Sequence, residues 1–330
     1  MLWEILKAGR TNNSDDLFTR LAARRVSVSK RGYIVLPHGT GAFNATAKGN
    51  NIIWEYNGER VQGNTCSFNV LRDNGTIRLA FDEALERLEI KNNNALKADL
   101  SDLGGKITST LNLYNCQNIT GDLADLGGKI TSYLNLYNCK NITGDLADLG
   151  GKITNTLSLY NCTKITGDLA DLGGKITSTL SLCNCQNITG GLADLGGKIT
   201  STLNLYNCQN ITGDLVDLGG KITSYLNLYN CKNITGDLAD LGGKITSYLI
   251  LDNCQNISGV YSGNVYPTGI NLSYTGVSAE EMDQNLINLN ENTSKKGTFT
   301  ANGMSRTAAS DDAIAGLISK GWTVTGLTKV

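Results

Sequence analysis

The chain has 330 residues, enough for a sizeable hydrophobic core, and its 29 basic and 30 acidic residues give a formal net charge of −1. This balance provides no field that would attract nucleic acid or an acidic membrane, so we expect neither as a partner. No apolar run approaches the roughly 18 residues of a membrane-spanning helix, and the first residues lack the basic start and long apolar stretch of a secretory signal. We therefore expect a protein that is made in the cytoplasm and is not inserted into a membrane.

Residues 1–84 do not repeat and are predicted to form a separate domain for attachment or assembly. A helix of about ten residues is expected between Ser14 and Arg25, because a capping serine and two acids open this segment and two arginines close it. Glycines and β-forming residues dominate from Val26 to Phe81, which predicts a small β-rich domain. Five apolar residues are the predicted assembly contacts, with packing of the helix stripe against its own domain as the alternative: Trp3, Leu6, Leu17, Phe18 and Leu21.

A unit of 23 residues is then copied head to tail, and seven copies cover residues 98–258 without insertion or deletion. A representative copy, Gly121 to Thr143, reads GDLADLGGKITSYLNLYNCKNIT. One copy cannot bury its seven recurring apolar positions alone, whereas stacked copies place each residue against its own equivalent. This period predicts a solenoid. Residues 85–97 match the strand half of the unit and are interpreted as a degenerate first coil, so the predicted solenoid spans residues 85–258.

Within each coil, one half is expected to be a strand and the other a tight turn. The segment Thr110 to Tyr114 alternates polar and apolar residues, which predicts a strand of a parallel sheet with Leu111 and Leu113 inward. The segment Gly121–Gly128 is too short for an ordinary α-helix. It predicts one helical or 3₁₀ turn with Asp122 as N-cap and a left-handed exit at one of its two final glycines.

Seven of the nine cysteines fall in one inward column of the repeat. We expect them to be buried free thiols that act as small hydrophobes. Cys183 replaces the tyrosine of most copies and is therefore expected on the exposed strand face. The asparagines from Asn115 to Asn253, one in each copy, are expected to bond turn backbone as a ladder.

The period fails after Ser258, and residues 259–330 predict an α/β cap. Ser278 to Glu281 forms a capping box before a helix, and a short strand is expected at residues 298–301. A second helix is expected to be capped by Ser310 and to turn Ile314, Leu317 and Ile318 inward, and a strand should begin at Trp322.

The pattern Leu111-x-Leu113-x-x-Cys116-x-x-Ile119-Thr120 resembles the LxLxxCxxIT core of cysteine-containing leucine-rich repeat proteins, over about half of the chain. The final Lys320-Gly-Trp-Thr-Val-Thr-Gly segment resembles the tails of such proteins from gut bacteria and their phages. Together with the repeat geometry, the resemblance implies an α/β fold. This fold is a solenoid with a parallel sheet and short convex turns, a small N-terminal β-rich domain and a C-terminal cap.

The sequence contains few residues in patterns that are typical of catalytic sites. The single histidine, His38, has no nucleophile elbow, metal pair or catalytic cysteine motif near it, so we expect neither an enzyme nor a cofactor or metal site. The Gly128-Lys129 pair lacks the flanking residues of a phosphate-binding loop, and a capping role explains Asp122 better than calcium does. Lys129 and its copies are expected to be solvated partners of the aspartates.

The outward strand positions carry tyrosine and asparagine instead of charged residues, which favours a surface that binds a protein or a glycan. The alternative is that the tyrosines simply suit parallel strands and stack on each other. The predicted binding residues are Tyr114, Tyr133, Tyr137, Tyr160, Tyr206, Tyr225, Tyr229, Tyr248, Asn112, Asn135, Asn204 and Asn227. We expect a non-catalytic recognition or structural protein, either a phage virion component such as a head, tail-fibre or decoration protein, or a bacterial surface or cytoplasmic binding protein.

Overall fold

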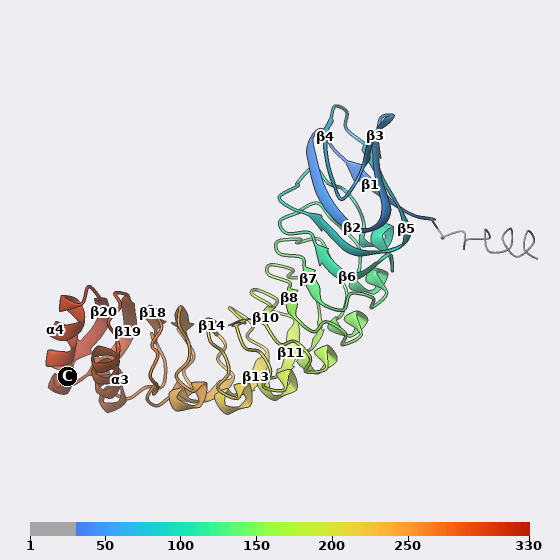
Figure 1. The fold of residues 1–330 in the computed structure, drawn as a ribbon. Coiled ribbons are helices and arrows are strands. Elements are labelled where there is room, and N and C mark those ends of the chain that lie inside the picture. Colours follow the sequence, from blue (N-terminus) through green and yellow to red (C-terminus); the bar gives the residue numbers. More distant parts are fainter. Residues whose placement is uncertain (1–30) are drawn as a thin grey trace, which may run out of the picture.

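The computed structural model describes residues 31–330. The helix expected at residues 14–25 and the predicted assembly contacts from Trp3 to Leu21 lie outside the described residues. Figure 1 shows an arc in which a β-rich region forms one end, a row of coils forms the body, and a helix-and-strand cap forms the other end. The strands line the inner side of the arc and the short helical turns line the outer side (Figure 1).

The β-rich region contains five antiparallel strands: β1 (Arg31–His38), β2 (Gly41–Tyr56), β3 (Glu59–Gln62), β4 (Thr65–Val70) and β5 (Gly75–Ile90). Alternating residues of these strands are buried, as expected for strands with one face on a core. The largest buried side chains are Phe43, Trp54 and Phe81. This region confirms the predicted small β-rich domain.

Strand β5 belongs to both the β-rich region and the solenoid. It pairs antiparallel with β1 and β2, and its last residues pair parallel with β6 (Ile107–Asn112), where Leu88 lies opposite Leu111. The boundary expected at residue 84 therefore falls inside β5, and one 15-stranded sheet runs from the β-rich region to the C-terminal cap.

The solenoid strands are short, parallel and in register. They are β7 (Tyr133–Asn135), β8 (Thr156–Ser158), β10 (Thr179–Ser181), β12 (Thr202–Asn204), β14 (Tyr225–Asn227), β16 (Tyr248–Ile250) and β18 (Gly269–Asn271). Leu180 pairs with Leu157 on one side and Leu203 on the other, and all three are fully buried. Equivalent residues thus form continuous columns, which confirms the solenoid predicted from the 23-residue period.

The outer turns are 3₁₀ helices, except for the first, α2 (Leu100–Leu103). They are η1 (Leu123–Leu126), η2 (Leu146–Leu149), η3 (Leu169–Leu172), η4 (Leu192–Leu195), η5 (Leu215–Leu218) and η6 (Leu238–Leu241). Asp122 caps η1 by accepting a hydrogen bond from the Ala124 N–H, and Gly127 exits it at φ 60°, as predicted. The expected pairing of lysines with aspartates is wrong. No lysine of the Lys129 column forms an ion pair among residues 31–330, because the aspartates accept backbone and threonine hydrogen bonds instead.

A second parallel sheet that the sequence analysis did not predict lies just before the outer turns. Its strands are β9 (Gly167–Asp168), β11 (Ile188–Gly191), β13 (Ile211–Asp214), β15 (Ile234–Asp237) and β17 (Ile257–Ser258). The glycine in this segment allows the coils to approach closely. A Cβ added to Gly167 of β9, which has φ +116°, would lie 2.7 Å from the backbone nitrogen of Leu146 in the preceding coil.

The asparagine ladder exists, but it joins side chains instead of bonding turn backbone. Asn138 donates its amide to the Oδ1 of Asn115 at 2.8 Å, and the same contact recurs between successive coils up to Asn253. These asparagines adopt left-handed backbone conformations with φ of 58° to 64°, which asparagine tolerates better than most residues. The backbone contacts belong to another column, where for example Asn141 donates to the Gln117 carbonyl at 3.1 Å.

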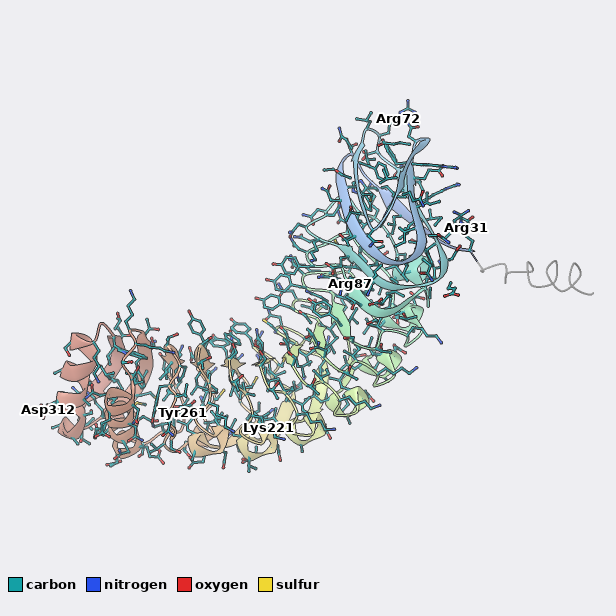
Figure 2. The ribbon with its side chains drawn as sticks, viewed as in Figure 1. Arg31, Arg72, Arg87, Lys221, Tyr261 and Asp312 are labelled. Atoms are coloured by element: carbon teal, nitrogen blue, oxygen red, sulfur yellow. The ribbon has the colours of Figure 1, made fainter. Side chains whose placement is uncertain are left out.

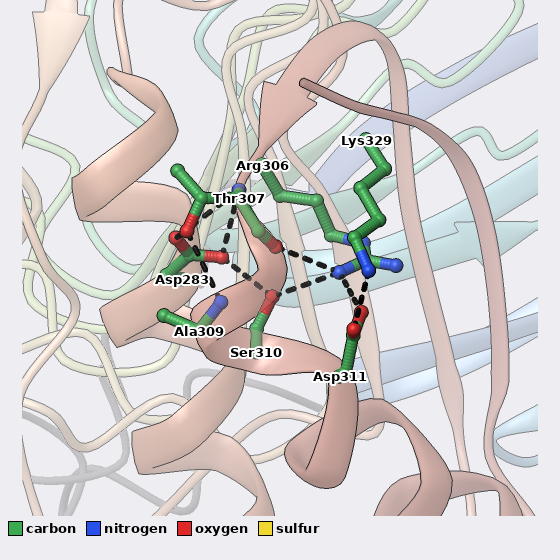
Figure 3. A network of polar contacts seen from close by, with 7 residues as sticks. All are labelled: Asp283, Arg306, Thr307, Ala309, Ser310, Asp311 and Lys329. Atoms are coloured by element: carbon green, nitrogen blue, oxygen red, sulfur yellow. Dashed lines mark hydrogen bonds and ion pairs between the residues drawn. The ribbon is translucent and has the colours of Figure 1, made fainter.

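The C-terminal cap contains α3 (Ala279–Asn292), β19 (Thr298–Arg306), η7 (Ala308–Ser310), α4 (Asp311–Ser319) and β20 (Thr323–Lys329). The capping box between Ser278 and Glu281 is confirmed. Two expectations for α4 are wrong. Ser310 occupies the N-cap position, but its side chain makes no capping hydrogen bond because its hydroxyl donates to Asp283 at 2.5 Å (Figure 3). Ile318 is not inward but 58% exposed.

Among residues 31–330, no helix combines the length and the apolar character needed to cross a membrane.

Candidate binding face

The structure brings the predicted tyrosines and asparagines together on the strand side of the arc, which we call the concave face. Leu111 and Leu113 are fully buried, so the alternating residues between them point away from the core. Figure 2 shows side chains, several of them ringed, along this inner side. They form three columns that follow the register of the strands, for example Thr110 beside Tyr133 and Asn112 beside Asn135.

The tyrosine column that begins at Tyr114 is stacked. Ring centroids are 4.6 Å apart between Tyr114 and Tyr137, 4.4 Å between Tyr137 and Tyr160, and 4.5 Å between Tyr206 and Tyr229. Because the ring faces cover each other, the half-buried side chains offer solvent mainly their edges and hydroxyl groups. The column therefore presents a row of phenol hydroxyls to a partner.

Cys183 interrupts this column, and the expectation that it is exposed is wrong: only 2% of its surface is accessible. It occupies the position between Tyr160 and Tyr206 in this column. Its thiol is also hydrogen-bonded to the Tyr160 hydroxyl. Burial raises the pKa of the Cys183 thiol to about 11, partly opposed by this hydrogen bond. The same hydrogen bond, followed by burial, raises the pKa of Tyr160.

The asparagine column supports the tyrosines instead of offering free amides. The Oδ1 of Asn135 accepts the backbone N–H of Tyr137 at 3.0 Å, and its Nδ2 donates to the Tyr133 hydroxyl at 3.1 Å. Asn112, Asn204 and Asn227 accept the equivalent backbone N–H. Asn112 and Asn227 are 7% and 5% exposed, so they orient the face more than they form its surface.

Tyr133, Tyr225 and Tyr248 make up the third predicted group. The rings of Tyr225 and Tyr248 meet edge to face at 6.0 Å, and Tyr248 is 49% exposed. Tyr133 has threonines beside it in both neighbouring strands, at Thr110 and Thr156. This column is therefore mixed: Thr110 precedes Tyr133, three threonines follow it, and Tyr225 and Tyr248 come after them.

Sequence reasoning missed the charged residues that extend the concave face at its two ends. Lys91 and Asp252 lie 23 residues before Tyr114 and 23 residues after Tyr229, a spacing that could have placed them in the tyrosine column. Burial raises the pKa of the Asp252 carboxyl, although a hydrogen bond with Asn271 acts in the opposite direction. At the other end, Lys91 forms an ion pair with Glu89, and its Nζ lies 2.6 Å from the Glu89 Oε2.

The only histidine of the chain lies in the core. His38 is fully buried, its Nε2 is 3.0 Å from the Asn93 Oδ1, and its Nδ1 is 2.5 Å from the Gly39 carbonyl oxygen. These contacts and an edge-to-face contact with Phe43 give it a structural role. Within residues 31–330, no group of three or more histidine, cysteine, aspartate or glutamate side chains is arranged to hold a metal ion.

The fold and its columns define a leucine-rich-repeat-like solenoid. No protein-family model, curated protein or solved structure matches the chain.

Proposed function

We propose that the protein is a non-catalytic recognition module that binds a protein or glycan through its concave face. The observation that supports this most strongly is the chemistry of that face. Its columns carry tyrosine, asparagine, threonine and serine, whereas the lysines of the repeat lie exposed on the turns. A surface kept only for solvation would be charged, while tyrosine is enriched where proteins bind other molecules.

The stacking contacts also explain why the face suits binding. Tyr114, Tyr137, Tyr206 and Tyr229 are each held by a stacked ring and, through an asparagine, at the backbone, so little side-chain freedom remains to be lost when a partner binds. The concave curvature seen in Figure 1 would let several coils contact one partner at once.

The experiment is a screen of the immobilised full chain against a glycan array and a random peptide-display library. Each ligand is then measured on a variant with phenylalanine at Tyr137, Tyr160 and Tyr206, which keeps the rings and removes three hydroxyls. A matched control carries glutamine at the exposed residues Lys152 and Lys175. We expect ligands that bind the control as they bind the wild type and bind the phenylalanine variant weakly. Ligands that depend on the lysines instead, or no ligand in either screen, would contradict the proposal.

We further propose that residues 1–84 attach the solenoid to a larger assembly, such as a phage virion. The resemblance of the final segment to phage and gut-bacterial repeat proteins favours this, and a bacterial surface or cytoplasmic binding protein is the alternative. The test compares the oligomeric state of the full chain with that of a Leu17→Asp, Phe18→Asp variant by light scattering. Assembly that is lost in the variant supports attachment through this region, and identical assembly argues against it.

A further inference from the structure

The concave face does not end at the first coil, because its columns continue onto the β-rich region. Glu89 of β5 pairs with Asn112 on one side and with Thr46 of β2 on the other, and Thr46 pairs with Thr65 of β4. Residues that lie directly opposite each other in a sheet share a face. The asparagine column therefore extends through Glu89 into a row of threonines.

The tyrosine column continues in the same way. The backbone N–H of Asn92 donates to the Tyr114 carbonyl at 2.8 Å, just as the N–H of Asn115 donates to the Tyr137 carbonyl at 2.7 Å. Lys91 therefore stands one coil before Tyr114, at the position that a tyrosine fills in the next three coils.

At this junction the surface forms a hollow of about 320 Å³. Six of its lining residues matter here: Asn44, Thr46, Thr65, Cys66, Glu89 and Lys91. The Glu89 carboxylate lies 2.6 Å from the Lys91 ammonium and 3.4 Å from the Arg87 guanidinium. The side chains of Glu89 and Lys91 are 19% and 48% exposed, so a strong acceptor and a strong donor both reach the hollow.

Tyr114 is the terminal ring of its stack. It contacts the Tyr137 ring on one side, and among residues 31–330 no aromatic ring contacts it on the side of Lys91. Tyr114 does not line the hollow itself, but it follows the lining residue Lys91 in the tyrosine column, and its second face is not covered by another tyrosine.

We propose that this hollow is a saccharide subsite, in which a sugar ring packs against Tyr114 while Glu89 and Lys91 bind its hydroxyls. A sugar hydroxyl both donates and accepts, so a carboxylate and an ammonium side by side suit neighbouring hydroxyls of one ring. An extended peptide would need a free sheet edge or an apolar pocket. β2 and β5 are paired along both sides, and most of the residues that line the hollow are polar. The carboxylate and ammonium pair therefore favours a sugar, and a peptide strand added to β4, which pairs only with β2 among residues 31–330, is the alternative that the display screen tests. This inference rests on the proposed recognition function and places the sugar at one end of the face.

The test is saturation-transfer NMR on the full chain with cellotetraose, chitotetraose, mannotetraose and maltotetraose, each added alone. We expect transfer to at least one of the four. Its affinity should fall about tenfold or more in Glu89→Gln and Tyr114→Ala and stay unchanged in Lys152→Gln, which alters an exposed residue of the turns. Tyr229→Ala, which removes the ring at the opposite end of the column, tests whether the sugar depends on the rest of the concave face instead. Lys91→Gln is a second variant of the hollow, and circular dichroism melting verifies that each variant is folded.

The other outcomes separate this inference from the recognition function. If binding is lost in Tyr229→Ala but kept in Glu89→Gln and Lys91→Gln, the hollow is not the sugar subsite. The rest of the concave face would then be the binding surface. If the only ligands found are peptides from the display screen, the saccharide assignment would be wrong, while the proposed recognition function would stand. No transfer to any of the four sugars would contradict the subsite.

Discussion

The thiol of Cys139 donates a hydrogen bond to the backbone carbonyl of Leu113 in the preceding coil, with sulfur and oxygen 3.1 Å apart. The same contact recurs for the other repeat cysteines, at 2.9 to 3.3 Å. The Leu113 carbonyl also accepts the backbone N–H of Cys116, so the thiol adds a second bond at a turn that neither leucine nor alanine could supply. This explains why the inward column is cysteine and confirms that these thiols are free and buried.

Cys162→Ala should destabilise the solenoid by about 1–3 kcal/mol, because it removes the S–H donor and leaves a small cavity in a fully buried site. Thr163→Ala, at the exposed neighbouring position, should cost about 0.5 kcal/mol or less. Urea denaturation of both variants measures the difference. Equal midpoints would show that the thiol contributes nothing beyond an alanine.

All nine cysteines should resist alkylation in the native protein at neutral pH, including Cys183. Burial raises the pKa of the thiols, to about 11 for Cys116 and Cys183 and to about 12 for Cys208, so little thiolate forms. Tyr160→Ala removes one of the rings beside Cys183 and should make that thiol alone react. Mass spectrometry after iodoacetamide treatment reads out each site, and rapid labelling of the wild type would be inconsistent with the burial.

Leu180→Asp should destabilise the protein by several kcal/mol, whereas Thr179→Asp on the concave face should cost about 0.5 kcal/mol. Leu180 is fully buried between its equivalents in two coils, and Thr179 is partly exposed. Thermal melting compares the two. Similar melting shifts would mean that the inward and outward assignment is wrong.

Gly191→Asp should stabilise the protein by about 0.5–1 kcal/mol. Gly191 stands where the other 3₁₀ turns have a capping aspartate, and its turn lacks the side-chain cap bond. Its φ of −107° suits any residue, and an added Cβ would have no contact closer than 3.5 Å. The matched control is Gly190→Ala, which should destabilise the fold because Gly190 has φ +105° and a Cβ there would lie 2.5 Å from Asp168. A lower melting temperature for Gly191→Asp would count against the capping account.

The stability that Asp283 provides should disappear in acid. Burial raises the pKa of this carboxyl, but hydrogen bonds from Ser310 and Thr307 and the nearby Arg306 outweigh burial and leave the pKa below its usual value. Figure 3 shows these contacts joining α3 to the segment before α4. A carboxyl whose pKa is lowered by folding stabilises the fold above its unfolded pKa, about 3.9, and loses this effect as the pH falls through the folded pKa.

Asp283→Asn should therefore lower the melting temperature at pH 7, and the gap to the wild type should close as the pH falls below about 4. A gap that stays constant from pH 7 to pH 3 would exclude ionisation as its source.

The repeat made the solenoid predictable, because identical copies in sequence impose identical neighbours in space. Leu111, Leu113 and Asp122 are placed as expected. The second sheet was not predicted, because two to four residues around a glycine carry no alternating pattern. Gly167 and its equivalents, which carry no Cβ, let the coils of this sheet approach closely.

The candidate face was predictable in membership but not in detail. Periodicity placed the tyrosines on one side, yet it could not show that Tyr160 covers Cys183 or that Asn112 is buried, since both depend on side-chain size and orientation. The hollow near Glu89 was also missed. It depends on the pairing of β2 with β5, two strands that no repeat connects.

Hydroxyl-radical footprinting of the full chain, free and bound to a ligand from the array or display screens, tests the central claim most directly. The account predicts that oxidation of the tyrosines from Tyr114 to Tyr229 falls on binding, while oxidation of exposed residues on the turns, such as Val216, does not change. Protection of the turns with unchanged concave tyrosines would show that the partner binds elsewhere.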